Sequence, residues 1–302
     1  MPIALCYHSV SKEAKNADSD FLQVHQFKLQ LETLKKFLRG ISLEELPQSS
    51  RTFSVTFDDG YENNLHAAEV LSTLKLPATF FVTVQNLERG EYFYWDLLEF
   101  AYKNQIVSVI DLLSQAFDNR NLSLSDATKL VSSLNSETRA SLCTQIDGIL
   151  RLESHAEQTM RERKPLSVTQ LQSIASDPLF KIGGHTWTHG SLGAKDGVVD
   201  FHQELNSAQF KLKEWLGEFP TEFAYPFGTV EDYTEESVSK IRSAGFKSAW
   251  TTRGNWIVRN ENVFKMPRLV VGNWPPDQLL KQVFRALART KVQKYRSQSL
   301  EY

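Results

Sequence analysis

The chain has 302 residues, of which 41% are hydrophobic and 23% are Asp, Glu, Lys or Arg, an ordinary globular composition that excludes disordered and collagen-like proteins. Its formal net charge of −2 argues against a nucleic-acid substrate, because proteins that bind polyanions usually carry a basic excess. Its two cysteines, Cys6 and Cys143, provide neither a disulfide framework nor a cysteine zinc site, which fits a reducing compartment.

Short apolar runs alternate with helix-forming segments along the chain, a pattern typical of a parallel β-sheet with helical connections. Strands are predicted at residues 3–7, 53–57, 78–84, 181–183, 222–225, 248–252 and 268–271. Helices are predicted between them at residues 26–38, 63–74, 168–174, 201–215 and 235–243. About six or seven such units indicate an α/β barrel or a doubly wound sheet.

Two segments depart from this alternation within what we expect to be one catalytic domain over residues 1–302. Residues 88–164 are helix-forming and predict a helical insertion, which either covers the functional face of the barrel as a lid or packs on its outside. Residues 277–302 predict a basic amphipathic helix, since three lysines, three arginines and no acidic residue lie between 281 and 296. Such a helix either packs through its apolar stripe or lies on an anionic membrane surface.

The sequence also bears on cellular location. The first ten residues lack the charged region of a signal peptide, and no apolar run reaches the length of a membrane span. We therefore expect a cytoplasmic protein, with peripheral membrane contact through residues 279–302 as an open alternative.

The first candidate site motif is a predicted strand that ends in two adjacent carboxylates, Asp58 and Asp59, followed by Gly60. Two acids so close together resist joint ionisation unless a cation lies beside them. Asp-Gly is also a common turn sequence, so a purely structural role stays open.

The second motif places His185 and His189 four residues apart after a Gly-Gly pair at the end of another strand. This spacing predicts that both imidazoles lie on one side of a helical turn. Two histidines and one carboxylate form a typical site for zinc or a related divalent metal.

With these motifs the chain resembles the polysaccharide deacetylase family, the NodB-homology or carbohydrate esterase 4 enzymes. Residues 56–60 match the first family motif and residues 185–189 match the second. The third motif, usually Arg-x-Pro-Tyr-Gly, is matched imperfectly by residues 224–228. The resemblance covers roughly residues 1–85 and 165–275, and it implies a distorted (β/α) barrel of the NodB-homology type.

The resemblance implies a metal-dependent hydrolase that removes an acetyl group, N-acetyl before O-acetyl or formyl, from a sugar or glycan precursor. Asp59, His185 and His189 would bind one divalent ion, zinc foremost, with cobalt, nickel, manganese or iron as alternatives. Asp58 would be the general base that takes a proton from a metal-activated water. Phe227 would contribute a backbone N–H to the oxyanion site.

The chain departs from the common family pattern at the general acid. No histidine occurs after residue 246, where the family usually has one. Instead His8 follows Cys6 and Tyr7 at the end of the first predicted strand, which resembles a circularly permuted subgroup typified by biofilm poly-N-acetylglucosamine deacetylases. In a closed barrel the first and last strands are neighbours, so His8 is our candidate general acid.

The remaining substitutions concern groups around the substrate. Ala224 replaces the arginine of the third motif, and Arg268 on the last strand is the candidate to hold Asp58 in its place, with a surface salt bridge as the alternative. We further expect substrate contacts from four residues, although core packing would equally explain the last: Tyr225, Pro226, Phe227 and Trp256.

Two other functions remain compatible with the fold. One is a metal-free hydrolase of cyclic amides from the same superfamily, and the other is a non-catalytic carbohydrate-binding relative. The intact set of Asp59, His185 and His189 argues against the metal-free hydrolase, since such enzymes can lose metal ligands. The same set together with the candidate base Asp58 and the candidate acid His8 argues against a non-catalytic relative.

Overall fold

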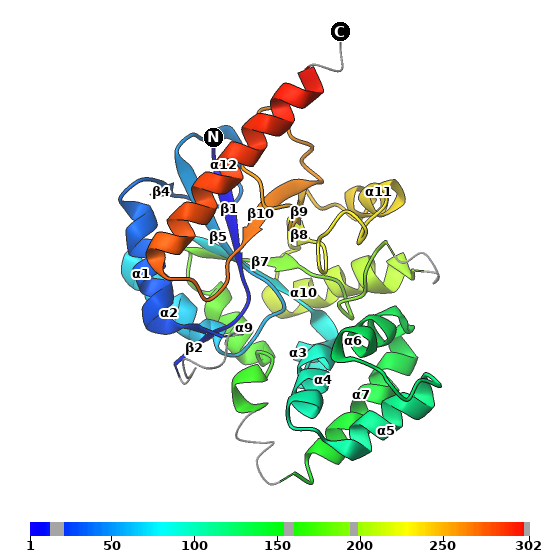
Figure 1. Ribbon diagram of the computed structural model, residues 1–302. Helices are drawn as coiled ribbons and strands as arrows, with labels where there is room; N and C mark the ends of the chain where they lie inside the picture. The colour runs from blue at the N-terminus through cyan, green and yellow to red at the C-terminus, as the bar shows by residue number, and fades with distance from the viewer. Residues whose placement is uncertain (13–20, 154–159, 194–198, 299–302) are drawn as a thin grey trace.

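Figure 1 shows the computed structural model of the chain, which describes residues 1–12, 21–153, 160–193 and 199–298. Its centre is a parallel sheet in the order β1-β10-β9-β8-β7-β6-β5-β4, and β1 pairs with β5 as well. Within the described residues, seven strands thus close into a barrel. β4 pairs with β5 but is not part of this closed ring. The strands are β1 (Ile3–Tyr7), β4 (Arg39–Gly40), β5 (Thr52–Phe57), β6 (Ala78–Val82), β7 (Phe180–Gly184), β8 (Glu222–Ala224), β9 (Ser248–Thr251) and β10 (Met266–Val270). The predicted α/β barrel is confirmed.

The barrel closes where β1 lies between β5 and β10. Ile3 pairs in register with Phe53 on one side, and Ala4 pairs with Arg268 on the other. Every residue of β1 and β5 is buried. This burial explains the continuous apolar runs of both strands, since helices cover the outer face of a parallel barrel and side chains fill its interior. The first and last strands are therefore neighbours, as a closed barrel requires.

Helices surround the barrel, and local sequence signals set where they begin and end. They are α1 (Val24–Lys35), α2 (Asn64–Leu74), α9 (Val168–Ala175), α10 (Ala208–Leu216), α11 (Glu235–Ser243) and α12 (Pro276–Gln298). Ser167 and Thr234 each form a capping box at the start of α9 and α11. The backbone of Gly217 is left-handed at the end of α10, a conformation that glycine adopts without steric cost. Shorter elements are β2 (Val10–Ser11), β3 (Leu22–Gln23) and η1 (Leu46–Gln48).

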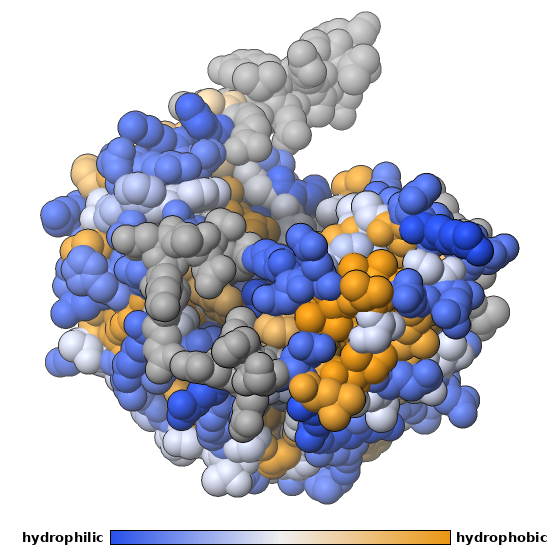
Figure 2. Space-filling view, turned by 60° about the horizontal axis from the view of Figure 1, so that its bottom comes forward, coloured by the Kyte–Doolittle hydropathy of each residue, from blue (hydrophilic) through white to orange (hydrophobic). Residues whose placement is uncertain are grey.

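The segment between β6 and α9 is helical, as predicted, and its helices α3 to α7 occupy the lower right of Figure 1. Its elements are α3 (Val84–Arg89), α4 (Tyr94–Lys103), α5 (Val107–Ala116), α6 (Leu124–Ser133), α7 (Ser136–Leu150) and η2 (Arg161–Arg163). Side chains from α4 to α7 form an apolar cluster separate from that of the barrel. Figure 2 shows apolar residues gathered on the surface on this side of the molecule. The insertion therefore has a core of its own.

The structure differs from the predicted elements at several ends. The helix predicted at 201–215 begins as a π-helix, η3 (His202–Ser207), which continues into α10. The strand predicted at 78–84 ends at Val82, because Thr83 already caps α3. The predicted basic helix over 277–302 corresponds to α12, but residues 299–302 and the side chains of 289 and 291–298 lie outside the described part. No helix in the described part of the chain is long and apolar enough to cross a membrane.

Candidate active site

Polar side chains from several strands meet at one rim of the barrel. In a parallel barrel the carboxyl ends of all strands lie at the same rim, where the following loops build the active site. Asp58 and Asp59 follow β5 directly, and His185 follows β7. His8 follows β1, and Arg268 lies in β10, which pairs with β1. Residues that the sequence analysis singled out one by one are thus brought together.

Asp59, His185 and His189 form a compact buried cluster. The Oδ1 atom of Asp59 lies 3.5 Å from Nε2 of His185 and 3.3 Å from Nε2 of His189. The other ring nitrogen of His185, Nδ1, donates to the carbonyl oxygen of Ala224 at 2.8 Å. This bond places a proton on Nδ1 and orients the ring of His185 so that its Nε2 faces the cluster.

The backbone around this cluster is unusual. Asp59, Thr186, His189 and Phe227 all have left-handed conformations, with φ of 75°, 66°, 56° and 59°. A positive φ costs on the order of 1–3 kcal/mol for a β-branched or bulky residue, and such residues concentrate at functional sites. The prediction of a helical turn between the two histidines is wrong, because residues 185–189 form a bend with two left-handed positions. The two imidazole rings nevertheless lie with their centroids 4.8 Å apart.

The cluster has the chemistry of a divalent metal site. Its three ligand atoms lie within 4.8 Å of one another, and all three residues are buried. Burial alone would raise the pKa of Asp59, but hydrogen bonding to His185 and His189 outweighs it and holds that pKa well below its usual range. Burial lowers the pKa of His189, which favours a neutral ring, whereas at His185 the negative charge of Asp58 outweighs burial and raises the pKa. Both rings must be neutral to bind a metal ion, so a bound ion would displace the proton that His185 otherwise retains. A buried carboxylate facing two imidazole nitrogens therefore fits a bound zinc or a similar ion.

Asp58 has a different partner. Arg268 donates from Nη1 to Oδ1 of Asp58 at 2.6 Å and from Nη2 to Oδ2 at 2.7 Å, a bidentate pair between fully buried groups. A further Nη1 bond to Thr56 at 3.1 Å and an Nε bond to the carbonyl of Thr251 at 3.3 Å fix the guanidinium. Burial would raise the pKa of Asp58, but the charge of Arg268 outweighs it and lowers that pKa below its usual range. Asp58 is therefore held ionised and in a fixed orientation.

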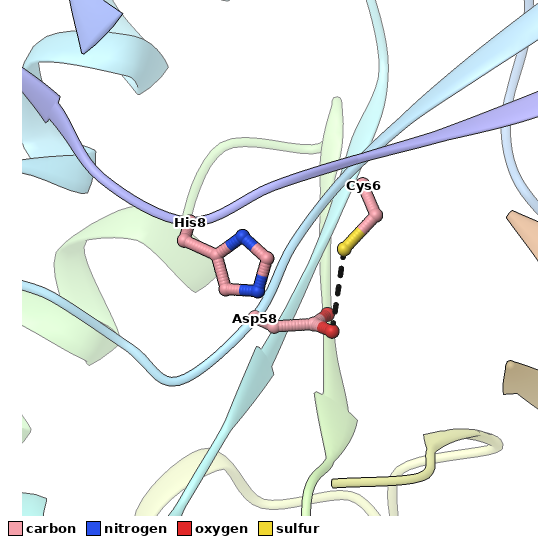
Figure 3. A group of neighbouring side chains, drawn as sticks. All are labelled: Cys6, His8 and Asp58. Carbon is pink, nitrogen blue, oxygen red and sulfur yellow. Dashed lines mark hydrogen bonds between the residues drawn. The ribbon is translucent and has the colours of Figure 1, made fainter. Parts of the chain in front are cut away.

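Cys6 and His8 approach Asp58 from β1 and the residues after it (Figure 3). The thiol of Cys6 donates to Oδ2 of Asp58 at 3.4 Å, and burial raises the pKa of that thiol, so it stays protonated. The side chain of His8 is half-buried, and a ring nitrogen lies within 4.8 Å of both Cys6 Sγ and an Asp58 oxygen. Asn64 donates to the carbonyl oxygen of His8 at 2.6 Å and so holds the segment that carries the imidazole.

Two aromatic rings flank His189. The ring of Phe227, whose exposed fraction is 38%, lies 4.9 Å from the His189 ring between centroids. The half-buried ring of Trp95, from α4 of the insertion, lies 4.4 Å from it on the same measure. The indole N–H of Trp95 donates to the hydroxyl of Tyr61 at 2.8 Å. The insertion therefore forms part of the site.

The remaining residues that were predicted to contact substrate are buried and make hydrogen bonds within the protein. Tyr225 is fully buried and donates its hydroxyl to the carbonyl of Phe264 at 2.9 Å. Pro226 is buried in a tight turn, in which its carbonyl accepts the N–H of Gly228. Trp256 lies in the apolar core with α12, where its indole N–H donates to the carbonyl of Val283 at 2.8 Å. Their contact with substrate stays a prediction.

Sequence reasoning did not single out Trp95 or Asn64. Trp95 stands in the run Tyr92-Phe93-Tyr94-Trp95 at the start of the insertion. Four successive aromatic residues where a barrel strand gives way to an insertion are a signal that could have placed this segment over the site. Asn64 offered no such signal, because its contact depends on how the loop after β1 folds.

Both the sequence and the fold match known proteins. The sequence profile of the polysaccharide deacetylase family matches residues 45–131 and 151–249. Among curated proteins, none matches the sequence significantly.

Several solved structures are similar in fold. The Streptococcus pyogenes deacetylase PplD, solved in complex with acetate, has a TM-score of 0.61 at 15% identity, covering 93% of this chain and 97% of its own. The polysaccharide deacetylase BC0361 from Bacillus cereus has a TM-score of 0.60 at 18% identity, covering 93% of this chain and 68% of its own. IcaB from Ammonifex degensii has a TM-score of 0.57 at 18% identity, covering 92% and 94%.

Proposed function

Because the chain belongs to the polysaccharide deacetylase family, hydrolases that act on the amide bonds of acetylated sugars, we propose that it removes an N-acetyl group from a sugar or glycan precursor with one divalent metal ion. The observation that carries this proposal is the pair of adjacent carboxylates with different partners. Asp59 faces His185 and His189, whereas Asp58 faces Arg268. One rim of the barrel thus offers a metal-binding set beside a fixed carboxylate.

Asp59, His185 and His189 would hold the metal ion. A divalent ion bound there supplies Lewis-acid chemistry, since it lowers the pKa of water and polarises an acyl oxygen. Zinc is the first choice for two neutral imidazoles and a carboxylate, although other first-row divalent ions accept the same ligands.

Asp58 is proposed as the general base. It accepts a proton from the water that attacks the acyl carbon, and Arg268 holds its carboxylate toward the site in the ionised form. The bidentate geometry leaves the orientation of the carboxylate fixed before substrate binds, which is how a base reaches high effective concentration.

His8 is proposed as the general acid. Hydrolysis forms a bond between the water oxygen and the acyl carbon and breaks the carbon–nitrogen bond, and the leaving amine must gain a proton. His8 lies beside Asp58 on the β1 side, half-buried, so its imidazole is open to a substrate at the rim. The products are acetate and the free amino sugar.

The backbone N–H of Phe227 is proposed to stabilise the oxyanion. Among the described residues this N–H donates to no acceptor. Phe227 lies in a turn with left-handed backbone, and two hydrogen bonds on either side of its N–H hold this turn. Those bonds run from the Gly228 N–H to the Pro226 carbonyl and from the Thr252 hydroxyl to the Phe227 carbonyl. The rings of Phe227 and Trp95 supply apolar walls for the acyl group and the sugar.

The test is acetate release from matched panels of N-acetylated and O-acetylated sugars by the apoprotein and by the protein reloaded with zinc or cobalt. We expect release from N-acetyl substrates only after reloading, with a weaker rate on O-acetyl substrates. A chelated apoprotein that releases acetate at the full rate would contradict metal dependence. A reloaded protein that hydrolyses only O-acetyl substrates would contradict the N-acetyl assignment.

A further inference from the structure

The loop that carries both histidines needs support from outside itself. Thr186 and His189 are left-handed, so the backbone of residues 185–189 can form neither a helix nor a strand that would hold it. A metal site requires its ligands at fixed positions, and groups around the ligands usually provide this.

Glu204 provides such support from the π-helix η3. Its side chain is 8% exposed, and its Oε2 accepts the backbone N–H groups of Trp187 and Thr188, each at 3.0 Å. Its Oε1 accepts the hydroxyl proton of Thr188 at 2.5 Å. One carboxylate thus receives three hydrogen bonds from the two residues that immediately precede His189.

Arg139 reaches the same loop from the insertion. Its Nη2 donates to the Thr188 hydroxyl at 2.5 Å and to the Thr188 carbonyl at 3.3 Å, and its side chain is buried, with an exposed fraction of 6%. Its Nη1 donates to the carbonyls of Ser132 and Leu134 at the end of α6. The Thr188 hydroxyl therefore joins a buried arginine of α7 to the buried carboxylate of Glu204.

Trp95 is a second contact between the insertion and this loop, since its ring packs on the ring of His189. The two contacts come from different helices, α4 and α7, which belong to the same apolar cluster. A displacement of α4 and α7 would therefore act on the loop through both side chains, in addition to the backbone hydrogen bonds that Thr186 and Trp187 accept from Val84 and Gln85 of α3.

We propose that Glu204 and Arg139 are positioning residues for His185 and His189, so that the helical insertion sets the metal affinity of the barrel. This inference rests on the proposed metal site. It assigns the insertion a function that neither a lid nor outside packing would require. Its consequence is that changes in α6 or α7 alter metal binding without touching a ligand.

The experiment measures the affinity of the apoprotein for zinc and for cobalt by competition with a chromophoric chelator. The variants are Glu204→Gln, Arg139→Met and Arg139→Lys, and the matched control is Arg151→Met, at an exposed ion pair with Asp147 just after α7. We expect Glu204→Gln and Arg139→Met to weaken binding roughly 10- to 100-fold, the usual effect of groups that orient metal ligands. Arg139→Lys should recover part of this loss, because a lysine can still donate to Thr188.

Two further measurements separate positioning from general damage to the fold. The visible absorption bands of the cobalt-loaded variants should shift, since these bands report the ligand geometry, and the control should keep the wild-type spectrum. Thr188→Val removes only the hydroxyl that joins Arg139 to Glu204, and it serves if Glu204→Gln does not fold. We expect this variant to weaken binding by a smaller factor, with a shifted cobalt spectrum.

The outcomes distinguish this inference from the proposed function. Wild-type apoprotein that binds neither zinc nor cobalt would overturn the proposed metal site. Wild-type binding with unchanged affinity and spectra in Glu204→Gln, Arg139→Met and Thr188→Val would overturn the inference alone. Equal loss in the Arg151→Met control would also overturn it, because the effect would then be an unspecific response to changes in the insertion.

Discussion

The two adjacent aspartates occupy opposite environments although a single peptide bond separates them. Asp58 lies against a permanent cation, the buried guanidinium of Arg268, which holds it in a bidentate pair. Asp59 lies against two imidazoles, whose charge, unlike that of a guanidinium, depends on pH. The difference shows how adjacent carboxylates can be given separate partners, which the proposed roles of base and metal ligand require.

The largest effect is expected for the base. Asp58→Asn should lower the rate constant for deacetylation by about 10² to 10⁴, because the amide cannot accept the proton of the attacking water. Metal affinity should stay within a few-fold of wild type, since the ligand atoms belong to other residues. Steady-state acetate release and chelator competition on the same protein preparation check both statements. Loss of the metal ion in Asp58→Asn would contradict the proposal that Asp59, and not Asp58, binds the metal.

Removal of the fixed cation should destabilise the protein. Arg268→Met leaves a buried carboxylate without its partner, which typically costs about 3–5 kcal/mol of unfolding free energy. Burial then raises the pKa of Asp58 above its unfolded value, so the folded state binds the extra proton. Stability of this variant should therefore improve as the pH falls from 7 to 5, whereas in the wild type Asp58 contributes stability that is lost only as acid reaches its lowered pKa.

Urea unfolding of the apoproteins at both pH values measures this effect. The control is the double variant Asp58→Asn with Arg268→Met, which has no charge to leave unpaired and should be more stable than Arg268→Met alone. A deficit in Arg268→Met that does not change between pH 7 and pH 5 would show that lost packing, rather than an unpaired charge, is the cause.

A change at His8 tests whether this residue, which lies beside Asp58, protonates the leaving amine. His8→Ala should slow hydrolysis of an N-acetyl sugar by about 10² to 10³, because an amine must be protonated to leave. Hydrolysis of an aryl acetate should change much less, since a phenolate leaves without a proton. Rate constants for the two substrates, measured with wild type and variant, test this. Equal losses on both substrates would make His8 a structural residue.

The smallest effect is expected at the ring that the insertion places on His189. Trp95→Ala should lower kcat/KM by about 3- to 10-fold, the range of an aromatic contact of about 1 kcal/mol. Trp95→Phe keeps a ring and should recover most of this loss, although it lacks the indole N–H that donates to Tyr61. Unchanged kinetics in Trp95→Ala would show that this residue of the insertion does not contact the substrate.

Those features of the barrel and its site that depend on local sequence patterns could be predicted from the sequence. Ile3–Tyr7 and Glu235–Ser243 have the predicted bounds, because an uninterrupted apolar run and a capping Thr234 mark them. The four-residue spacing singled out the two histidines, whereas the choice of Asp59 rather than Asp58 as their partner came from the resemblance to the family motif. The bend between His185 and His189 did not, since a left-handed Thr186 opposes its own propensity and depends on tertiary contacts.

Groups that act across the fold were harder to predict. Arg268 was proposed from the end of the last strand, but its approach to Asp58 depends on barrel closure, which pairs β10 with β1. Glu204 and Arg139 gave no signal, because a glutamate and an arginine in helical sequence usually face solvent. The two-residue strands β2, β3 and β4 are too short to show alternation, so they were missed.

The most direct test of the account compares the metal content of Asp58→Asn and Asp59→Asn, measured by elemental analysis after identical reloading with zinc. We expect about one ion per chain in Asp58→Asn and almost none in Asp59→Asn, with acetate release lost in both. Loss of the ion from both variants, or its retention in Asp59→Asn, would contradict the assignment of one aspartate to the base and the other to the metal.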